Sequence, residues 1–138
     1  MSIIAGQRIL IVEDDAIIAL VLEEMLLDLG AAIVGPAASV PRGLELAAAG
    51  SIDAAIVDLN LAGTRSDPVM AALAAAGVPF VIASGYGESA ANHPGASALV
   101  MKPYDPGQIA RALSVALERK SLERASSSRL AQHATGAE

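Results

Sequence analysis

Four short apolar runs in this chain each end in a polar residue, and the chemistry of that residue differs from run to run. The runs and their ends are Ile9–Val12 before Glu13 and Asp14, Ala54–Val57 before Asp58, Val78–Ala83 before Ser84, and Leu99–Met101 before Lys102. If the runs are neighbouring strands of one parallel sheet, their carboxyl ends meet at the edge where open α/β sheets bind ligands. The sequence therefore predicts a pocket of carboxylates, a hydroxyl and an ammonium, which is typical of phosphoryl transfer.

Helical segments with recognisable start and stop signals separate these runs. Apolar residues recur at helical spacing from Ile18 to Leu29, after the N-cap candidates Asp14 and Asp15 and before Gly30. The other expected elements are a strand over Ala31–Val34 and helices over Val40–Ala49 after Ser39, from Asp67 through Ala76, and from Asp105-Pro106 to about Arg119. This alternation predicts an α/β fold with a doubly wound, five-stranded parallel sheet covered on both faces.

Two segments depart from this alternation. The residues from Gly87 to Ala96 include Pro94-Gly95 and have little apolar periodicity, so we expect the fourth helix to be short or disordered. After about Arg119 the sequence becomes serine-rich and polar, which favours a disordered tail. We therefore predict one domain over residues 1–122 and a flexible C-terminal tail over residues 123–138.

The composition argues against several kinds of partner. The net charge is -6 and no dense stripe of lysine and arginine occurs, so we expect no nucleic-acid binding. No apolar stretch approaches the ~20 residues of a membrane-spanning helix, so we expect no membrane association. The chain has no cysteine, and Met1–Gln7 lacks the features of a secretory signal, which together favour a cytoplasmic protein.

Taken together, the strand-end motifs resemble the receiver domain of two-component response regulators. These motifs are Val12-Glu13-Asp14-Asp15, Val57-Asp58, Ala83-Ser84-Gly85 and Lys102-Pro103, and the resemblance covers about Arg8 to Arg119. It implies the flavodoxin-like strand order 2-1-3-4-5, with Asp58 as the phosphoacceptor. It also implies a cis peptide bond between Lys102 and Pro103.

The residue types suit this chemistry independently of the family. Crowded carboxylates at Glu13, Asp14 and Asp58 would repel one another and bind protons more tightly unless a cation lies among them. Oxygen ligands with room for several waters suit Mg²⁺. The metal would offset charge on an incoming phosphoryl group, so that Asp58 could attack phosphorus in line and form an acyl phosphate.

The resemblance also implies a role for each remaining site residue. Asp14 would bind the metal directly and Glu13 through water, while the backbone carbonyl of Asn60 would supply another ligand. Lys102 would balance one phosphoryl oxygen as a point charge, and the hydroxyl of Ser84 would donate a hydrogen bond to another. For Asp15 we favour a helix N-cap over a metal ligand.

The residues after Ser84 point to a particular subgroup of receivers. Many receivers have an aromatic residue three positions before the lysine, where this chain has Leu99, whereas Tyr86 stands two residues after Ser84. This arrangement is similar to the "FAT GUY" subgroup, which implies histidine kinases of the HWE or HisKA2 type as partners. The match is partial, since Ile82 replaces the phenylalanine that the subgroup has before Ala83.

The resemblance implies a response regulator that accepts a phosphoryl group from a sensor histidine kinase or a phosphotransfer protein and signals to an unknown downstream protein. Such a chain would catalyse only its own phosphorylation and dephosphorylation. We expect the switch to order the segment Tyr86–Ala96, with Leu99 and Pro103 as further switch residues. The alternative is a receiver-like adaptor that binds partners without being phosphorylated.

Two other chemistries fit the sequence less well. Gly85–Ala90 matches the glycine pattern of a dinucleotide site with Asp105 downstream, but Pro94-Gly95 interrupts the helix that should receive the pyrophosphate. A haloacid-dehalogenase-like phosphatase would need a second aspartate two residues after Asp58, where this chain has Asn60.

Overall fold

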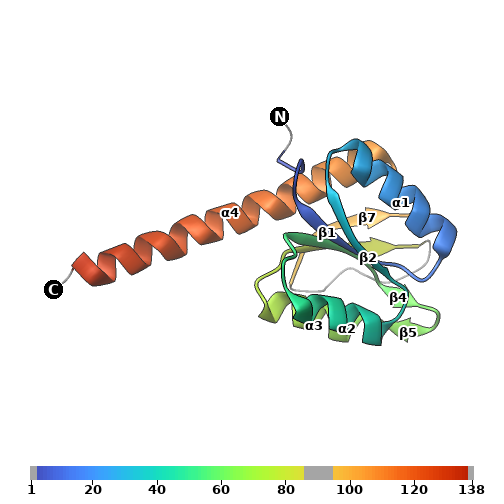
Figure 1. Cartoon of the computed structure of the whole chain (residues 1–138), viewed down its shortest axis with the longest axis horizontal. Helices are drawn as coiled ribbons and strands as arrows, with labels where there is room; N and C mark the ends of the chain where they lie inside the picture. Colours follow the sequence, from blue (N-terminus) through green and yellow to red (C-terminus); the bar gives the residue numbers. More distant parts are fainter. Residues whose placement is uncertain (1–2, 86–94, 137–138) are drawn as a thin grey trace.

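The computed structural model describes residues 3–85 and 95–136, with only the backbone described for residues 126–136 (Figure 1). Strands and helices alternate through most of this range. Their bounds are β1 (Arg8–Val12), α1 (Ala16–Asp28), β2 (Ala32–Ala37), α2 (Val40–Ala49), β3 (Ala54–Asp58), β4 (Asn60–Leu61), β5 (Thr64–Arg65), α3 (Asp67–Ala75), β6 (Phe80–Ser84), β7 (Ala96–Met101) and α4 (Pro106–Gly136).

The central sheet is parallel, with strand order β2-β1-β3-β6-β7. This order confirms the predicted flavodoxin-like arrangement. Val12 pairs with Val57, and Asp58 pairs with Ala83 on the next strand. The carboxyl ends of β1, β3 and β6 therefore lie at one edge of the sheet, as the sequence pattern required.

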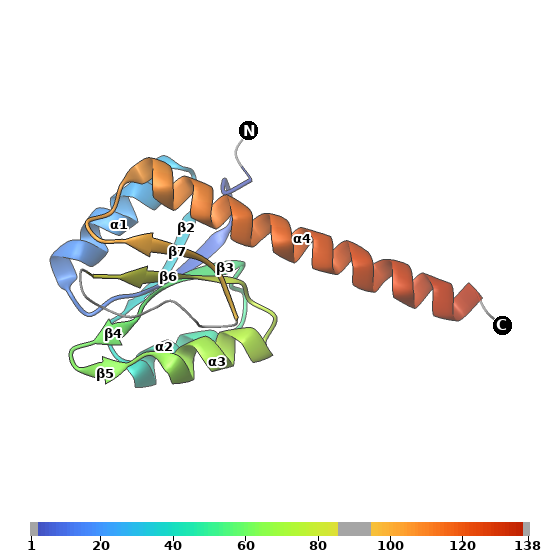
Figure 2. The same ribbon diagram turned by 180° about the vertical axis from the view of Figure 1, so that it is seen from behind.

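A separate hydrophobic core lies on each face of the sheet. On one face, Leu22 and Leu26 of α1 pack with Leu113 and Leu117 of α4 against the strands. On the other face, α2 and α3 cover a core that includes Phe80. Figure 2 shows the same arrangement from behind, with α2 and α3 below the sheet and α1 and α4 above it. No helix in the described part of the chain has the length and apolar character needed to cross a membrane.

The predicted helix caps hold in the structure. The carboxylate of Asp15 accepts hydrogen bonds from the backbone N–H groups of Ile17 and Ile18 at the start of α1. Ser39 caps α2 by accepting from the N–H of Arg42. A cap of this kind contributes about 1 kcal/mol. Asp15 is therefore held by its own helix, which confirms the N-cap interpretation.

Three elements differ from the sequence interpretation. Strand β2 continues through Pro36 to Ala37, because an edge strand tolerates a residue without an N–H. The antiparallel pair β4 and β5 was not expected, since two-residue strands carry no periodic pattern. Where we expected a flexible tail from residue 123, α4 continues to Gly136. The segment between Gly107 and Gly136 has no glycine or proline, and strong helix formers fill its middle.

The domain limits at residues 1–122 remain a prediction. The expected weak fourth helix lies in residues 86–94, outside the described residues.

Candidate functional site

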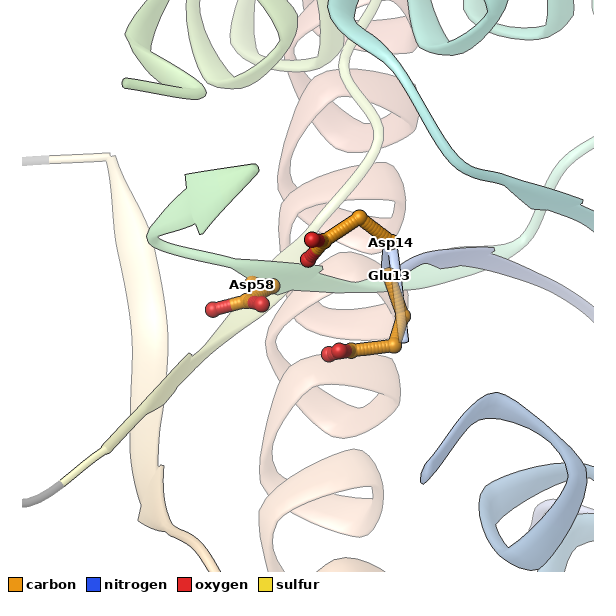
Figure 3. Close-up of side chains that lie close together, drawn as sticks. All are labelled: Glu13, Asp14 and Asp58. Atoms are coloured by element: carbon orange, nitrogen blue, oxygen red, sulfur yellow. The ribbon is translucent and has the colours of Figure 1, made fainter. Parts of the chain in front are cut away.

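Three carboxylates meet where β1 and β3 end. Glu13 and Asp14 follow β1 directly, and Asp58 is the last residue of β3. One oxygen of each carboxylate lies within 4.8 Å of the others, and Figure 3 shows the three side chains converging on one region. Glu13 and Asp58 are buried, whereas Asp14 is exposed. The cluster therefore has a buried floor and one side open to solvent.

Lys102 supplies a positive charge to this cluster. It follows β7, the edge strand on the other side of β6 from β3. Its Nζ lies 2.9 Å from Oδ2 of Asp58 and 3.0 Å from Oε2 of Glu13. Its backbone N–H donates to the carbonyl of Ser84 at 2.8 Å, and the peptide bond to Pro103 is cis, as predicted. Burial alone would lower the pKa of Lys102, but hydrogen bonds to Asp58 and Glu13 outweigh this effect and raise the pKa. Lys102 is therefore a fixed cation that faces both buried acids.

The buried position of Glu13 disfavours its charged form. Burial raises its pKa from 4.5 to about 7, and the negative charge of Asp58 adds to the rise while the hydrogen bond from Lys102 opposes it. Within the described residues, Oε2 of Glu13 is buried and accepts no hydrogen bond, although Lys102 lies close to it. The ion pair with Lys102 is the one described contact of this oxygen, so Glu13 has capacity for a further positive partner.

A divalent cation fits this donor set. Three carboxylates supply hard oxygen atoms, one of them on the exposed side chain of Asp14, which leaves room for water in the shell. A cation among them would add to the ion pair that Lys102 makes with Oε2 of Glu13 and would reduce the repulsion between Glu13 and Asp58. The residues present therefore fit Mg²⁺, with Asp14 on the side open to solvent and Glu13 and Asp58 beside the partly buried Lys102.

The loop after β3 is anchored by a residue that the sequence interpretation missed. Ser66 is fully buried, and its hydroxyl lies 2.6 Å from the carbonyl oxygen of Asp58 and 3.1 Å from that of Leu59. Its N–H also donates to the carbonyl of Leu59. Ser66 therefore fixes the backbone on which Asp58 stands. In the sequence, Ser66 stands directly before Asp67-Pro68, a pattern that predicts a helix start and gives no sign of a contact with Asp58.

Two other predicted residues lie beside Asp58. The N–H of Asn60 is 3.4 Å from Oδ1 of Asp58, at the beginning of β4. Ser84 ends the neighbouring strand β6, is buried, and donates its hydroxyl hydrogen to the carbonyl of Gly85 at 3.2 Å. In this state the hydroxyl of Ser84 is engaged with its own loop. Its bond to a phosphoryl oxygen, like the carbonyl contact of Asn60 with metal, remains a prediction.

The predicted switch residues are only partly described. Leu99 is half exposed on β7, and Pro103 is exposed after Lys102, whereas Tyr86 lies outside the described residues. The structure adds Tyr104, which was not predicted. Burial first, and then the charges of Glu13 and Asp58, raise its pKa. Tyr104 therefore stays neutral, and its ring packs against the core that α1 and α4 share.

This fold and this site define the class of protein. Residues 9–114 match the family model of the response regulator receiver domain, which covers more than half of the chain. The chain belongs to this family, and it is a receiver domain of the two-component type.

Individual relatives agree with the assignment. The transcriptional regulatory protein PdtaR of Mycobacterium tuberculosis is 32% identical over 120 residues, which is 82% of this chain and 58% of the relative. This chain therefore spans less than two thirds of that protein's length.

Solved structures show the same likeness. SdrG from Sphingomonas melonis Fr1 is 39% identical, with a TM-score of 0.73 over 85% of this chain and 99% of SdrG. The receiver domain of PhyR from Erythrobacter litoralis is 29% identical, with a TM-score of 0.71 over 82% of this chain and 91% of that domain.

Proposed function

We propose that this protein is a phosphorylatable switch in which Asp58 accepts a phosphoryl group in a Mg²⁺-dependent reaction. The observation that carries the proposal is the contact of Lys102 with Asp58 at 2.9 Å, inside a cluster that also holds Glu13 and Asp14. A carboxylate that serves only as a turn residue does not need a partly buried lysine and two further acids around it. Family membership gives independent support.

In the proposed reaction, a carboxylate oxygen of Asp58 attacks the phosphorus of the donor. A new oxygen–phosphorus bond forms, and the bond between phosphorus and the imidazole nitrogen of a phosphohistidine breaks, with the electron pair leaving on that nitrogen. When bound, Mg²⁺ supplies positive charge for the transferring group. Lys102 then pairs with one phosphoryl oxygen, and Ser84 turns its hydroxyl from the carbonyl of Gly85 to another.

We propose a sensor histidine kinase or a phosphotransfer protein as the donor, because both present phosphohistidine. The residues from Ser84 to Tyr86 favour a kinase of the HWE or HisKA2 type. The signal would pass to a downstream protein through contacts that depend on phosphorylation. The segment Tyr86–Ala96, β7 and α4 are the proposed location of those contacts.

Acetyl phosphate tests the proposal without a cognate kinase. Incubation with acetyl phosphate and Mg²⁺ should add one phosphoryl group, measured by intact mass, and EDTA should prevent the addition. Asp58→Asn should abolish it, whereas Asp28→Asn, a matched change on the exposed end of α1, should have no effect. Equal labelling of the Asp58 variant would refute the assignment. A complete lack of labelling in the folded wild type would favour the adaptor that binds partners without phosphorylation.

A further inference from the structure

Helix α1 exposes apolar side chains on the face that points away from the sheet. Ala19, Leu22 and Leu26 of this helix are buried in the core. The opposite side carries an α1 stripe with members three or four residues apart, namely Ile17, Leu20, Val21, Glu24, Leu27 and Asp28. Ile17 is 76% exposed and Leu27 is 58% exposed. A helix that is apolar on both faces is typical of one covered on both sides.

Helix α4 also has an exposed stripe, and its charge is of the opposite sign. Ala112, Leu113, Ala116 and Leu117 pack into the core, whereas the α4 stripe consists of Arg111, Val115, Arg119 and Leu122. Val115 is 43% exposed and Leu122 is 70% exposed. Figures 1 and 2 both show α4 projecting beyond the sheet. An isolated helical segment of this kind is marginally stable in water, which favours contact with another surface.

The charges of the two helices are complementary. Helix α1 contains the acids Glu23, Glu24 and Asp28 and no basic residue. Helix α4 contains five basic residues and two acidic ones, which are Arg111, Arg119, Lys120, Arg124 and Arg129 against Glu118 and Glu123. Within the part of the chain that the structure describes, the charged members of the two stripes form no ion pair.

We propose that the two stripes pair between two copies of this chain, so that α1 of each copy packs against α4 of the other. Both helices cover the same face of the sheet and share one core, so they form a single outer layer. A two-fold axis between them places each α1 opposite the partner copy's α4. The contact then joins apolar residues of both stripes and sets Glu24 and Asp28 against Arg111 and Arg119. Ile17, at the start of the α1 stripe, lines a hollow with Lys102 and Tyr104, so the pairing reaches up to the border of the acidic cluster.

Sedimentation equilibrium of the full chain over the micromolar range tests this dimer. The wild type should approach twice the chain mass of 13.9 kDa. The double variants Glu24→Lys/Asp28→Lys and Arg111→Glu/Arg119→Glu should each weaken association at least about tenfold, because opposite charges in the contact become like charges. Added salt should weaken the wild-type dimer.

Mixing the two double variants gives the sharpest result. Their heterodimer has one contact with reversed charges and one native contact, and both are attractive, so the mixture should associate more tightly than either variant alone. Arg42→Glu on α2, in an exposed ion pair on the other face, is the matched control and should dimerise normally. Circular dichroism confirms that each variant is folded.

Three outcomes would overturn the proposal. The first is a monomeric wild type across the concentration range, which would leave the stripes to a different protein. The second is a dimer that neither double variant weakens, which would place the interface elsewhere. The third is a mixture of folded variants that stays monomeric, which would show that the two stripes do not meet.

Discussion

Replacing Glu13 with glutamine should stabilise the Mg²⁺-free protein, and the gain should grow with pH. The variant keeps the size of the side chain and removes the buried negative charge. Burial raises the pKa of Glu13 from 4.5 to about 7, and one pKa unit corresponds to about 1.4 kcal/mol. The full shift would cost the folded protein roughly 3–4 kcal/mol, so the gain from the glutamine variant above neutral pH should be positive and no larger than this.

The direction follows from proton linkage. Between about pH 4.5 and pH 7 the folded state holds the proton of Glu13 more tightly than the unfolded state does. The free energy of unfolding therefore falls as pH rises through this window, and the loss is complete above it. Glutamine does not titrate, so the difference between Glu13→Gln and wild type should be near zero at the acidic end and largest above neutrality.

Urea unfolding followed by circular dichroism, in EDTA and at several pH values, measures this difference. Glu118→Gln, an exposed side chain of α4 outside both stripes, is the matched control and should show no such trend. Saturating Mg²⁺ should stabilise the wild type more than the Glu13 variant, because the cation needs the carboxylate. The reasoning is refuted if the advantage of Glu13→Gln is constant with pH or decreases as pH rises.

Three further changes test other parts of the account. Asp14→Ala should lower Mg²⁺ affinity in calorimetry more than Asp15→Ala does, because Asp15 is held as the cap of α1; a larger loss in the Asp15 variant would contradict the assignment. Ser66→Ala should lower the free energy of unfolding by about 1–3 kcal/mol, because it removes the hydroxyl that donates to the carbonyl of Asp58; an unchanged urea midpoint would show that this anchor is dispensable. Beryllofluoride with Mg²⁺ should increase hydrogen-exchange protection across Tyr86–Ala96, and unchanged protection there would argue against ordering of this segment as the switch.

Much of the sheet and most of the acidic cluster followed from local pattern. Each strand end that carried a polar residue was visible as a break in apolar sequence, and parallel pairing then required Glu13, Asp14, Asp58 and Lys102 to converge. The helix starts at Asp15 and Ser39 could also be predicted from the sequence, because an N-cap depends only on the next few residues.

What the sequence did not reveal depends on contacts between distant segments. Ser66 reads as a helix start, and its bond to the carbonyl of Asp58 exists only because β4 and β5 turn the chain back. Tyr104 follows Pro103 in sequence, but its partial burial depends on packing against residues of α1 such as Ile18. The serine run at residues 126–128 is typical of a tail, but the helix formers on both sides of it allow α4 to continue to Gly136.

The most direct test of the central claim is chemical identification of the phosphorylated residue. Borohydride reduces an aspartyl phosphate to homoserine, and tandem mass spectrometry of the digested protein locates the new residue. After treatment with acetyl phosphate and Mg²⁺, the account predicts homoserine at position 58 and at no other acid, and none when EDTA is present. Homoserine at Asp14 or Asp53 in place of Asp58, or its absence from a protein that gained phosphoryl mass, would contradict the account.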